Sequence, residues 1–370
     1  MSRFSDLLSP GARELGRRSL GPPRAQAAQG NRLPAIRLDS NENPLGPSPR
    51  AVEAIRSALA NVNLYPDDDC SELRGRLAAQ HGVQLEQTLV TAGSTGLLSI
   101  LCQVLLAPGL NAVTSERSFV VYSQLVRATG ARLIEAPMRE DGFDLAAILR
   151  AIDRDTRLVF LANPNNPTGT MLDAAEVEHF LARVPDHVIV ALDEAYYEYA
   201  AHFASLRGVV YSRARDYVLR GAGVVALRTF SKVHGLAGLR VGYGFGPAEL
   251  LTHCAQMRTT YSVASVAEAA ALAAIDDREH IERTLRLNAD QAEVLSSRLA
   301  GMGYRVVPTW ANFVYCDVGE DARRFATGLL EDGVVVRPLG VWGSPHSIRV
   351  SVGTAEENRV FLEAVRRMGA

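Results

Sequence analysis

Residues 229–240 read TFSKVHGLAGLR, and Lys232 in this segment follows an apolar run that favours a β-strand. The run, residues 223–227, predicts a buried strand whose carboxyl end presents Ser231 and Lys232, where open α/β sheets bind ligands. Arg240 lies eight residues beyond the lysine. An amine near apolar walls and a second cation loses its charge more readily, and is then nucleophilic enough to form a Schiff base. The segment predicts a reactive lysine beside an anion-binding arginine, although a solvated loop lysine is the commoner explanation for such a segment taken alone.

The composition excludes several classes of protein. The 370 residues are 47% hydrophobic and 22% charged, which is ordinary for a soluble globular protein with room for two domains. A net charge of −2 argues against a general nucleic-acid or membrane-surface binder. Four cysteines without a CxxC pair indicate neither a zinc site nor a disulfide framework. Because the sequence shows neither a membrane span nor the apolar centre of a signal peptide, we expect a cytoplasmic protein without metal, membrane or nucleic-acid partners.

Two further apolar runs end in polar turns. Residues 158–162 lead into NPNNPTG, which contains Asn166, and residues 188–192 lead into DEAY, which contains Asp193 and Tyr196. Parallel strands joined by right-handed crossovers bring their carboxyl ends to one edge of a sheet. We therefore expect these side chains to meet the lysine there. At each position alone, a turn that simply prefers Asn or Asp is the alternative.

A glycine-rich segment with the sequence AGSTG, residues 92–96, follows a short strand and opens a helix. Free backbone N–H groups and the positive end of the helix dipole make such a start an anion site. Gly93, Ser94 and Thr95 are therefore candidates to bind a phosphate. Serine and threonine are also ordinary N-cap residues, and that alternative remains open.

The last third of the chain predicts a second domain. Long helices follow residue 250, one of which would hinge two domains, and short strands alternate with helices after them, which is typical of an α+β domain. Arg337 ends one of these strands and Arg349 lies inside another, where it would face solvent or a cleft. We expect a large domain formed by residues 46–274. Residues 1–45 and 275–370 would form a small domain, which includes an N-terminal arm.

A lysine, a strand-end carboxylate, a tyrosine, an asparagine and a phosphate cradle are the parts of a pyridoxal 5'-phosphate site. The motifs SNENPLG (residues 40–46), NPNNPTG, DEAY and TFSK with GLAGLR resemble those of the fold-type-I aminotransferases, and more narrowly those of the histidinol-phosphate aminotransferase family. The resemblance runs from about residue 31 to the C-terminus. It implies an α/β fold with a mostly parallel seven-stranded sheet flanked by helices, plus a smaller α+β domain.

The resemblance also implies a role for each candidate residue. Lys232 would form the Schiff base, and Asp193 would pair with the pyridine nitrogen of the cofactor. Tyr196 and Asn166 would bond the ring oxygen, and Tyr122 of SFVVY would stack on the ring. The cofactor phosphate would be bound by Gly93, Ser94, Thr95, Ser231, Arg240 and, from the neighbouring subunit of a homodimer, Tyr65. The substrate-binding residues would be Asn43, Arg337 and Arg349.

The reaction implied is ping-pong transamination, in which an amino donor and a 2-oxo acid react in turn. Histidinol phosphate and 2-oxoglutarate are the expected pair. The sequence departs from the family at GSTG (93–96), where GSDE is common, at His234, where an aromatic is common, at RTTYSVA (258–264), and in LGPPRA (20–25), which lacks a proline-flanked tyrosine. An aminotransferase for aromatic or other amino acids, a phospho-amino-acid decarboxylase and a non-catalytic cofactor sensor are the alternatives.

Overall fold

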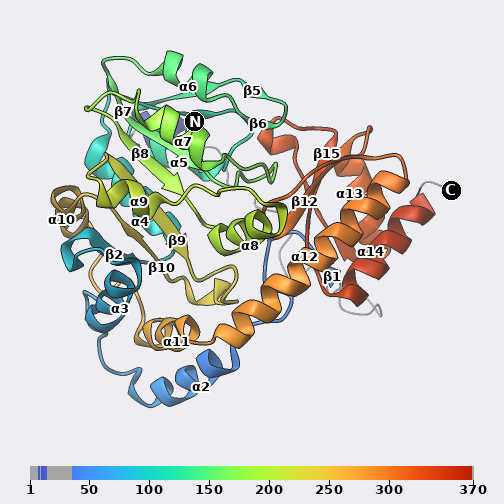
Figure 1. Cartoon of the computed structure of the whole chain (residues 1–370), viewed down its shortest axis with the longest axis horizontal. Coiled ribbons are helices and arrows are strands. Elements are labelled where there is room, and N and C mark those ends of the chain that lie inside the picture. The colour runs from blue at the N-terminus through green and yellow to red at the C-terminus, as the bar shows by residue number, and fades with distance from the viewer. Residues whose placement is uncertain (1–6, 9, 15–35, 369–370) are drawn as a thin grey trace.

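The computed structural model describes residues 7–8, 10–14 and 36–368. A broad lobe built around one large sheet lies beside a smaller lobe, and the long helix α12 (Arg278–Gly301) runs from one to the other (Figure 1). Of the expected N-terminal arm, the short helix α1 (Pro10–Glu14) is described, and residues 15–35 lie outside the described part of the chain. No helix of the described residues is both long and apolar enough to cross a membrane.

The large sheet has seven strands, as expected. Their order across the sheet is β2 (Thr88–Thr91), β10 (Gly242–Phe245), β9 (Val224–Thr229), β8 (Ile189–Asp193), β7 (Thr156–Ala162), β3 (Asn111–Ser115) and β4 (Arg132–Ala136). β10 is antiparallel to both of its neighbours, and the five strands from β9 to β4 are parallel to one another. The prediction of a mostly parallel sheet is therefore confirmed.

The sequence analysis missed β10, whose residues alternate glycine with aromatics. Glycine is depleted in strands, so the segment lacks an ordinary strand signal. The structure explains the glycines, because a Cβ atom at Gly244 would collide with Leu97 and one at Gly242 would collide with the backbone of Ser94. The strand thus lies close against the start of the neighbouring helix.

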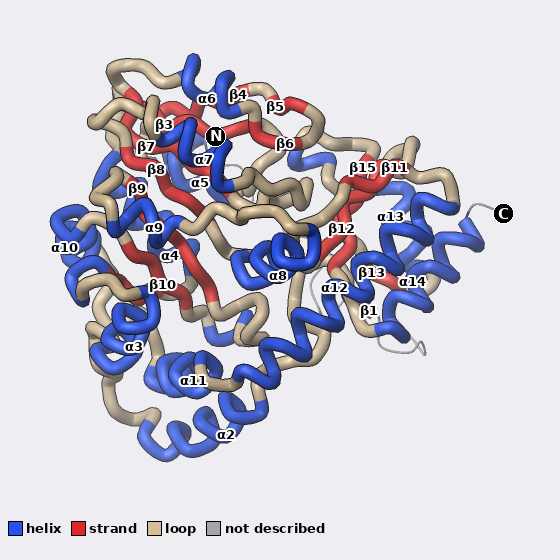
Figure 2. Tube along the Cα trace, viewed as in Figure 1, coloured by secondary structure: helices blue, strands red, loops and turns tan. Residues whose placement is uncertain are grey.

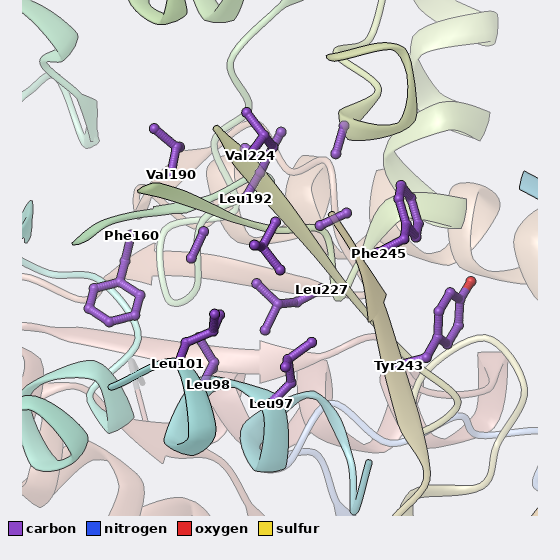
Figure 3. Close-up of a cluster of buried hydrophobic side chains, with 14 of the residues drawn as sticks. Leu97, Leu98, Leu101, Phe160, Val190, Leu192, Val224, Leu227, Tyr243 and Phe245 are labelled. Carbon is purple, nitrogen blue, oxygen red and sulfur yellow. The ribbon is translucent and has the colours of Figure 1, made fainter. Parts of the chain in front are cut away.

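Helices pack around this sheet, as Figure 2 shows. They are α2 (Pro49–Ala58), α3 (Ser71–His81), α4 (Ser94–Leu105), α5 (Val121–Ala128), α6 (Leu145–Ala151), α7 (Ala174–Leu181), α8 (Tyr197–Arg207), α9 (Ala214–Leu219), α10 (Ala248–Gln256) and α11 (Ser265–Ile275). Leu97, Leu98 and Leu101 of α4 point at Leu192 and Leu227 of the sheet, and all five side chains are fully buried (Figure 3). Each such leucine contributes about 1.5–3 kcal/mol of burial energy, which fixes the start of α4 against the strand ends.

The smaller lobe is built on an antiparallel sheet. Its strands, in order, are β11 (Arg305–Val307), β12 (Phe313–Asp317), β15 (Ser347–Ser351) and β14 (Arg337–Pro338), accompanied by helices α13 (Ala322–Glu331) and α14 (Ala355–Met368). Near the start of the chain, β1 (Ile36–Arg37) pairs in parallel with β13 (Val334–Val335), so the segment that follows the arm belongs to this lobe. A short hairpin, β5 (Met138–Arg139) with β6 (Gly142–Phe143), completes the strands described.

Two separate hydrophobic clusters form the main cores of the lobes. The first joins residues between Ala51 and Ala274, and the second joins Leu38 with residues between Ala292 and Val365, together with Phe203 of α8. A domain with its own core is the usual unit of folding. We therefore propose that the two domains are divided between residues 45 and 46 and between residues 274 and 275.

Candidate active site

A cavity of about 410 Å³ lies where strands β7, β8 and β9 end. The residues expected at these ends, namely Asn166, Asp193, Tyr196, Ser231 and Lys232, all line it. The small lobe contributes Arg337, Trp342 and Arg349, and the turn before α2 contributes Ser40, Asn41 and Glu42. The cavity therefore lies between the lobes, and parallel strand geometry brings the predicted residues together.

Lys232 points its amine into this cavity. Nζ donates to the carbonyl oxygen of Asn41 at 3.1 Å and lies 3.4 Å from that of Ser40. Burial, together with repulsion from the nearby Arg349 guanidinium, lowers the pKa of Lys232 to about 7. A large fraction of this amine is therefore neutral at physiological pH, as a nucleophilic lysine requires.

Asp193, the last residue of β8, presents a buried carboxylate to the same cavity. Its Oδ2 accepts a hydrogen bond of 2.8 Å from the Tyr122 hydroxyl, and its Oδ1 accepts one from the backbone N–H of Ala195 at 3.2 Å. Burial raises the pKa of Asp193 to about 6, while these two hydrogen bonds oppose the rise. The hydrogen bonds thus hold a buried carboxylate in its charged form near neutral pH.

The structure corrects the role expected for Tyr122. Tyr122 lines the cavity, but its side chain is completely buried and one ring face stacks on Phe160 with the ring centroids 4.5 Å apart, which leaves little of the ring for a cofactor to stack on. The hydroxyl instead orients Asp193. Phe119, three residues earlier, lines the cavity and meets Tyr122 edge to face at 5.5 Å. Both aromatic rings of SFVVY line the cavity, and only the packing shows that Phe119 is the more exposed of the two.

Tyr196 and Asn166 connect the cavity to the N-terminal turn and to the small lobe. The Tyr196 hydroxyl accepts a hydrogen bond of 2.9 Å from Asn41 Nδ2, and Asn166 Oδ1 accepts one of 2.6 Å from Arg349 Nη1. Arg349 also donates through Nη2 to the main-chain oxygen of Asp39 at 2.9 Å. Burial lowers the pKa of Arg349 to about 10, which leaves the guanidinium charged at neutral pH. A charged arginine is thus fixed at the wall opposite the strand ends.

Asn43, expected to bind substrate, does not face the cavity. Its Nδ2 donates to the carbonyl oxygen of Val233 at 2.9 Å and to Thr284 Oγ1 at 3.2 Å, and its Oδ1 accepts from Leu45 N. These bonds tie the turn to the lysine segment and to α12. Of the two asparagines in this turn, Asn41 lines the cavity. Both asparagines lie in one proline-rich turn, and nothing in the sequence distinguishes them.

Arg337 lines the cavity and is bound to Asp39. Its Nε donates to the main-chain oxygen of Asp39, and its Nη2 donates to Oδ2, each at 3.2 Å. Arg37 also donates to this carboxylate, through Nη2 to Oδ2 at 3.0 Å and through Nε to Oδ1 at 3.2 Å. Asp39, which is 1% exposed, therefore joins Arg37 and Arg337 and also orients Arg349. The sequence analysis missed Asp39 and Arg37, because nothing in the local pattern marks them.

The phosphate cradle expected from AGSTG begins helix α4. Gly93 has φ 74° and is the N-cap, with no side-chain cap bond, so the N-cap alternative for Ser94 and Thr95 is wrong. The Arg240 guanidinium lies beside Gly93, where a Cβ atom would come within 2.7 Å of Nη2, and Arg240 Nη1 donates to Ser231 Oγ at 3.3 Å. Open helical N–H groups, hydroxyls and an arginine thus face one spot, which is a donor set suited to a phosphate dianion.

Tyr65 lies away from the cavity of its own chain. It is 81% exposed and stacks on Tyr261 with the ring centroids 4.6 Å apart. It is absent from the residues that line the cavity in the described structure. A contribution from Tyr65 to a neighbouring subunit remains a prediction.

Four features together define the class of protein. They are a mostly parallel sheet and, at one edge of it, a buried lysine, a carboxylate at the end of a strand and an anion-binding site at the start of a helix. The family profile "Aminotransferase class I and II" matches residues 34–365. The chain therefore belongs to the class I and II aminotransferases.

Comparison with individual relatives narrows this assignment to histidinol-phosphate aminotransferases. The chain is 42% identical to histidinol-phosphate aminotransferase 2 of Pseudomonas aeruginosa, covering 100% of this chain and 99% of that one. It is 41% identical to the enzyme of the same name from Pseudomonas fluorescens, covering 99% and 98%. A crystal structure of histidinol-phosphate aminotransferase from Sinorhizobium meliloti in complex with pyridoxal-5'-phosphate superposes with a TM-score of 0.89 at 29% identity, covering 100% and 99%.

Proposed function

We propose that this aminotransferase uses pyridoxal 5'-phosphate to transfer the amino group of L-histidinol phosphate to 2-oxoglutarate, producing imidazole-acetol phosphate and L-glutamate in histidine biosynthesis. Relatives of that name, about 40% identical over nearly the whole chain, support the substrate. The observation that carries the chemistry is the buried Lys232 amine, whose pKa lies near 7, in a cavity completed by Asp193 and the anion cradle. The cytoplasm is the location we expect for this reaction.

The residues of the cavity fit pyridoxal phosphate. Because Gly93 has no side chain, the Arg240 guanidinium can lie beside it without a steric clash. Ser94, Thr95, Ser231 and Arg240 would hold the phosphate. Asp193 would hold the protonated ring nitrogen, because a carboxylate stabilises that charge. Tyr196 and Asn166 would hydrogen-bond the ring oxygen, and Phe119 would pack against the ring. When bound, the cofactor supplies an electron sink that stabilises negative charge at the carbon bearing the amino group.

The side chains of this protein supply binding and proton transfer. The neutral Lys232 amine can accept the proton from the carbon that bears the amino group and would deliver it to the cofactor, because the pKa of the amine is close to the working pH. The Arg349 fork is positioned to bind an anionic group of each substrate in turn. Asp39 holds Arg349 and Arg337 in place through its main-chain oxygen, and so fixes the orientation of the substrate.

Two aromatic side chains in the cavity favour a second candidate donor class. Phe119 and Trp342 both line it, and flat rings suit an aromatic amino acid as well as an imidazole. An aminotransferase for phenylalanine, tyrosine or histidine is therefore the competing function. We also propose a homodimer in which Tyr65 completes the cofactor site of the neighbouring subunit, since Tyr65 is exposed and lies outside its own cavity.

The test is a donor panel with the purified holoenzyme. Histidinol phosphate, phenylalanine, tyrosine and histidine are each supplied with 2-oxoglutarate, and glutamate and carbon dioxide are measured. We expect the highest kcat/KM with histidinol phosphate and no carbon dioxide. A higher kcat/KM with any other donor would replace this function with the broader one. The Lys232→Ala protein serves as the control, and should be folded, lack cofactor reducible by borohydride and show no turnover.

A further inference from the structure

Two buried hydrogen-bond donors in the cavity have no partner. Within the part of the chain that the structure describes, Arg349 Nε and Trp342 Nε1 are the cavity-lining side-chain atoms that are buried without a hydrogen bond. The Arg349 guanidinium carbon lies 6.0 Å from the centre of the Trp342 ring. Both unpaired donors therefore belong to one small region of the cavity.

An unpaired buried donor points to a ligand that supplies an acceptor. An indole N–H can only donate a hydrogen bond, and leaving such a group buried and unpaired costs about 1–3 kcal/mol. The positions are fixed by the fold, because Trp342 ends the short helix η6 (Gly340–Trp342) that connects the strands carrying Arg337 and Arg349. The arrangement thus places an unpaired arginine donor and an unpaired indole donor in one region of the cavity.

We propose that Trp342 is a specificity residue for phosphorylated amino donors. Arg349 binds two oxygens of the substrate phosphate, and Trp342 Nε1–H binds the third. A carboxylate has two oxygens, both of which the arginine fork can satisfy, whereas a phosphate monoester has three terminal oxygens. Trp342 therefore favours the phosphate donor over the 2-oxo acid and over unphosphorylated amino acids. This inference rests on the proposed function, because it concerns the donor bound at the same site.

The experiment compares Trp342→Phe with the wild-type holoenzyme, in which the cofactor phosphate cradle is already filled. The probe is inorganic phosphate, measured by calorimetry and as a competitive inhibitor of whichever donor the enzyme uses. We expect phosphate to bind about tenfold more weakly to Trp342→Phe, as for the loss of one hydrogen bond to a charged group. The KM for 2-oxoglutarate should change less than about twofold, since the arginine fork is intact.

A matched control uses the other of the two tryptophans. Trp310 lies outside the cavity, where its ring packs against Arg207, so Trp310→Phe should bind phosphate as the wild type does. In that variant Trp342 is the remaining tryptophan, and its fluorescence should change on titration with phosphate. This measurement tests the inference even if Trp342→Phe folds poorly.

The outcomes separate this inference from the proposed function. Unchanged phosphate binding by Trp342→Phe, an equal loss of phosphate and 2-oxoglutarate, or no fluorescence response in Trp310→Phe would each overturn the role of Trp342. If the wild type prefers histidine to histidinol phosphate while phosphate binding still depends on Trp342, the donor assignment fails and the phosphate contact stands. If histidinol phosphate is the preferred donor and Trp342→Phe binds phosphate as the wild type does, the donor assignment stands and the role of Trp342 fails.

Discussion

The Tyr122 hydroxyl donates a 2.8 Å hydrogen bond to the Asp193 carboxylate, and both side chains are buried beneath the cavity. Burial raises the pKa of Asp193 to about 6, and the hydrogen bond from Tyr122 works against that rise. The tyrosine therefore helps to keep the carboxylate charged, and its role is electrostatic rather than one of ring stacking.

Tyr122→Phe tests this relationship, since it removes the hydroxyl and keeps the ring. Without the hydrogen bond the pKa of Asp193 should rise further, and the carboxylate should then be protonated at a higher pH. We expect the acidic limb of the kcat/KM profile to move to higher pH, with a rate loss of about tenfold below pH 7, as for one hydrogen bond to a charged group. A profile that overlays the wild-type profile would show that the hydroxyl has no such role.

The lowered pKa of Lys232 predicts the pH dependence of cofactor uptake by the cofactor-free protein. The aldehyde reacts with the neutral amine, so the rate should rise as pH increases through about 7 and level off above about 8. An amine with the ordinary pKa of about 10.4 would give a rate that keeps rising up to that pH. Absorbance of the bound cofactor, followed by stopped flow from pH 6 to 10, measures this rate.

Asn43→Ala is predicted to affect stability more than catalysis. The substitution leaves the Val233 carbonyl and the Thr284 hydroxyl without their partner, which should cost about 1–3 kcal/mol in the free energy of unfolding. Denaturant unfolding measures this cost, and kcat should stay within about threefold. Asn41→Ala is the matched comparison and should instead lower kcat, because Asn41 holds the Tyr196 hydroxyl. A KM effect confined to Asn43→Ala would restore the original substrate assignment of that residue.

Arg349→Ala should weaken both substrates. Since the same fork is proposed to meet the donor phosphate and the 2-oxo acid carboxylate, each KM should rise about tenfold to a hundredfold, equivalent to about 1.5–3 kcal/mol. Arg349→Lys should restore only part of the loss, because an ammonium group cannot bind in a bidentate way. Steady-state kinetics with each substrate varied separately gives both values. A loss confined to one substrate would mean that the other is bound elsewhere.

Tyr65→Phe should loosen the cofactor if Tyr65 serves the neighbouring subunit. Mixing this variant with Lys232→Ala should then produce heterodimers in which one site has both a native lysine and a native tyrosine. Random pairing of equal amounts makes about half of the dimers heterodimers, and each heterodimer has one intact site, so we expect about a quarter of the wild-type activity at limiting cofactor. Sedimentation checks that dimers form, and a monomer at working concentration would contradict the shared site.

Much of the fold followed from local patterns in the sequence. The runs ending at Ala162, Leu192 and Leu227 are apolar because their strands are buried on both faces, and the turns that follow them are set by proline, asparagine and glycine. The topology of parallel strands then brings Asn166, Asp193 and Lys232 to one edge. These features depend on neighbouring residues and on general rules of chain connection, so the sequence alone could determine them.

Only the tertiary structure decided which side chains face the cavity and what orients them. Asn41 rather than Asn43 lines it, and Phe119 is half-buried there whereas Tyr122 is fully buried, although each pair lies in one short motif. The choice depends on partners far away in the chain, such as Tyr196, which is 155 residues beyond Asn41. Asp39 likewise acquires its role from Arg337 and Arg349, which the folding of the small lobe brings to it. Local pattern predicts where a strand ends, whereas the direction of a side chain is set by packing between segments that are distant in the sequence.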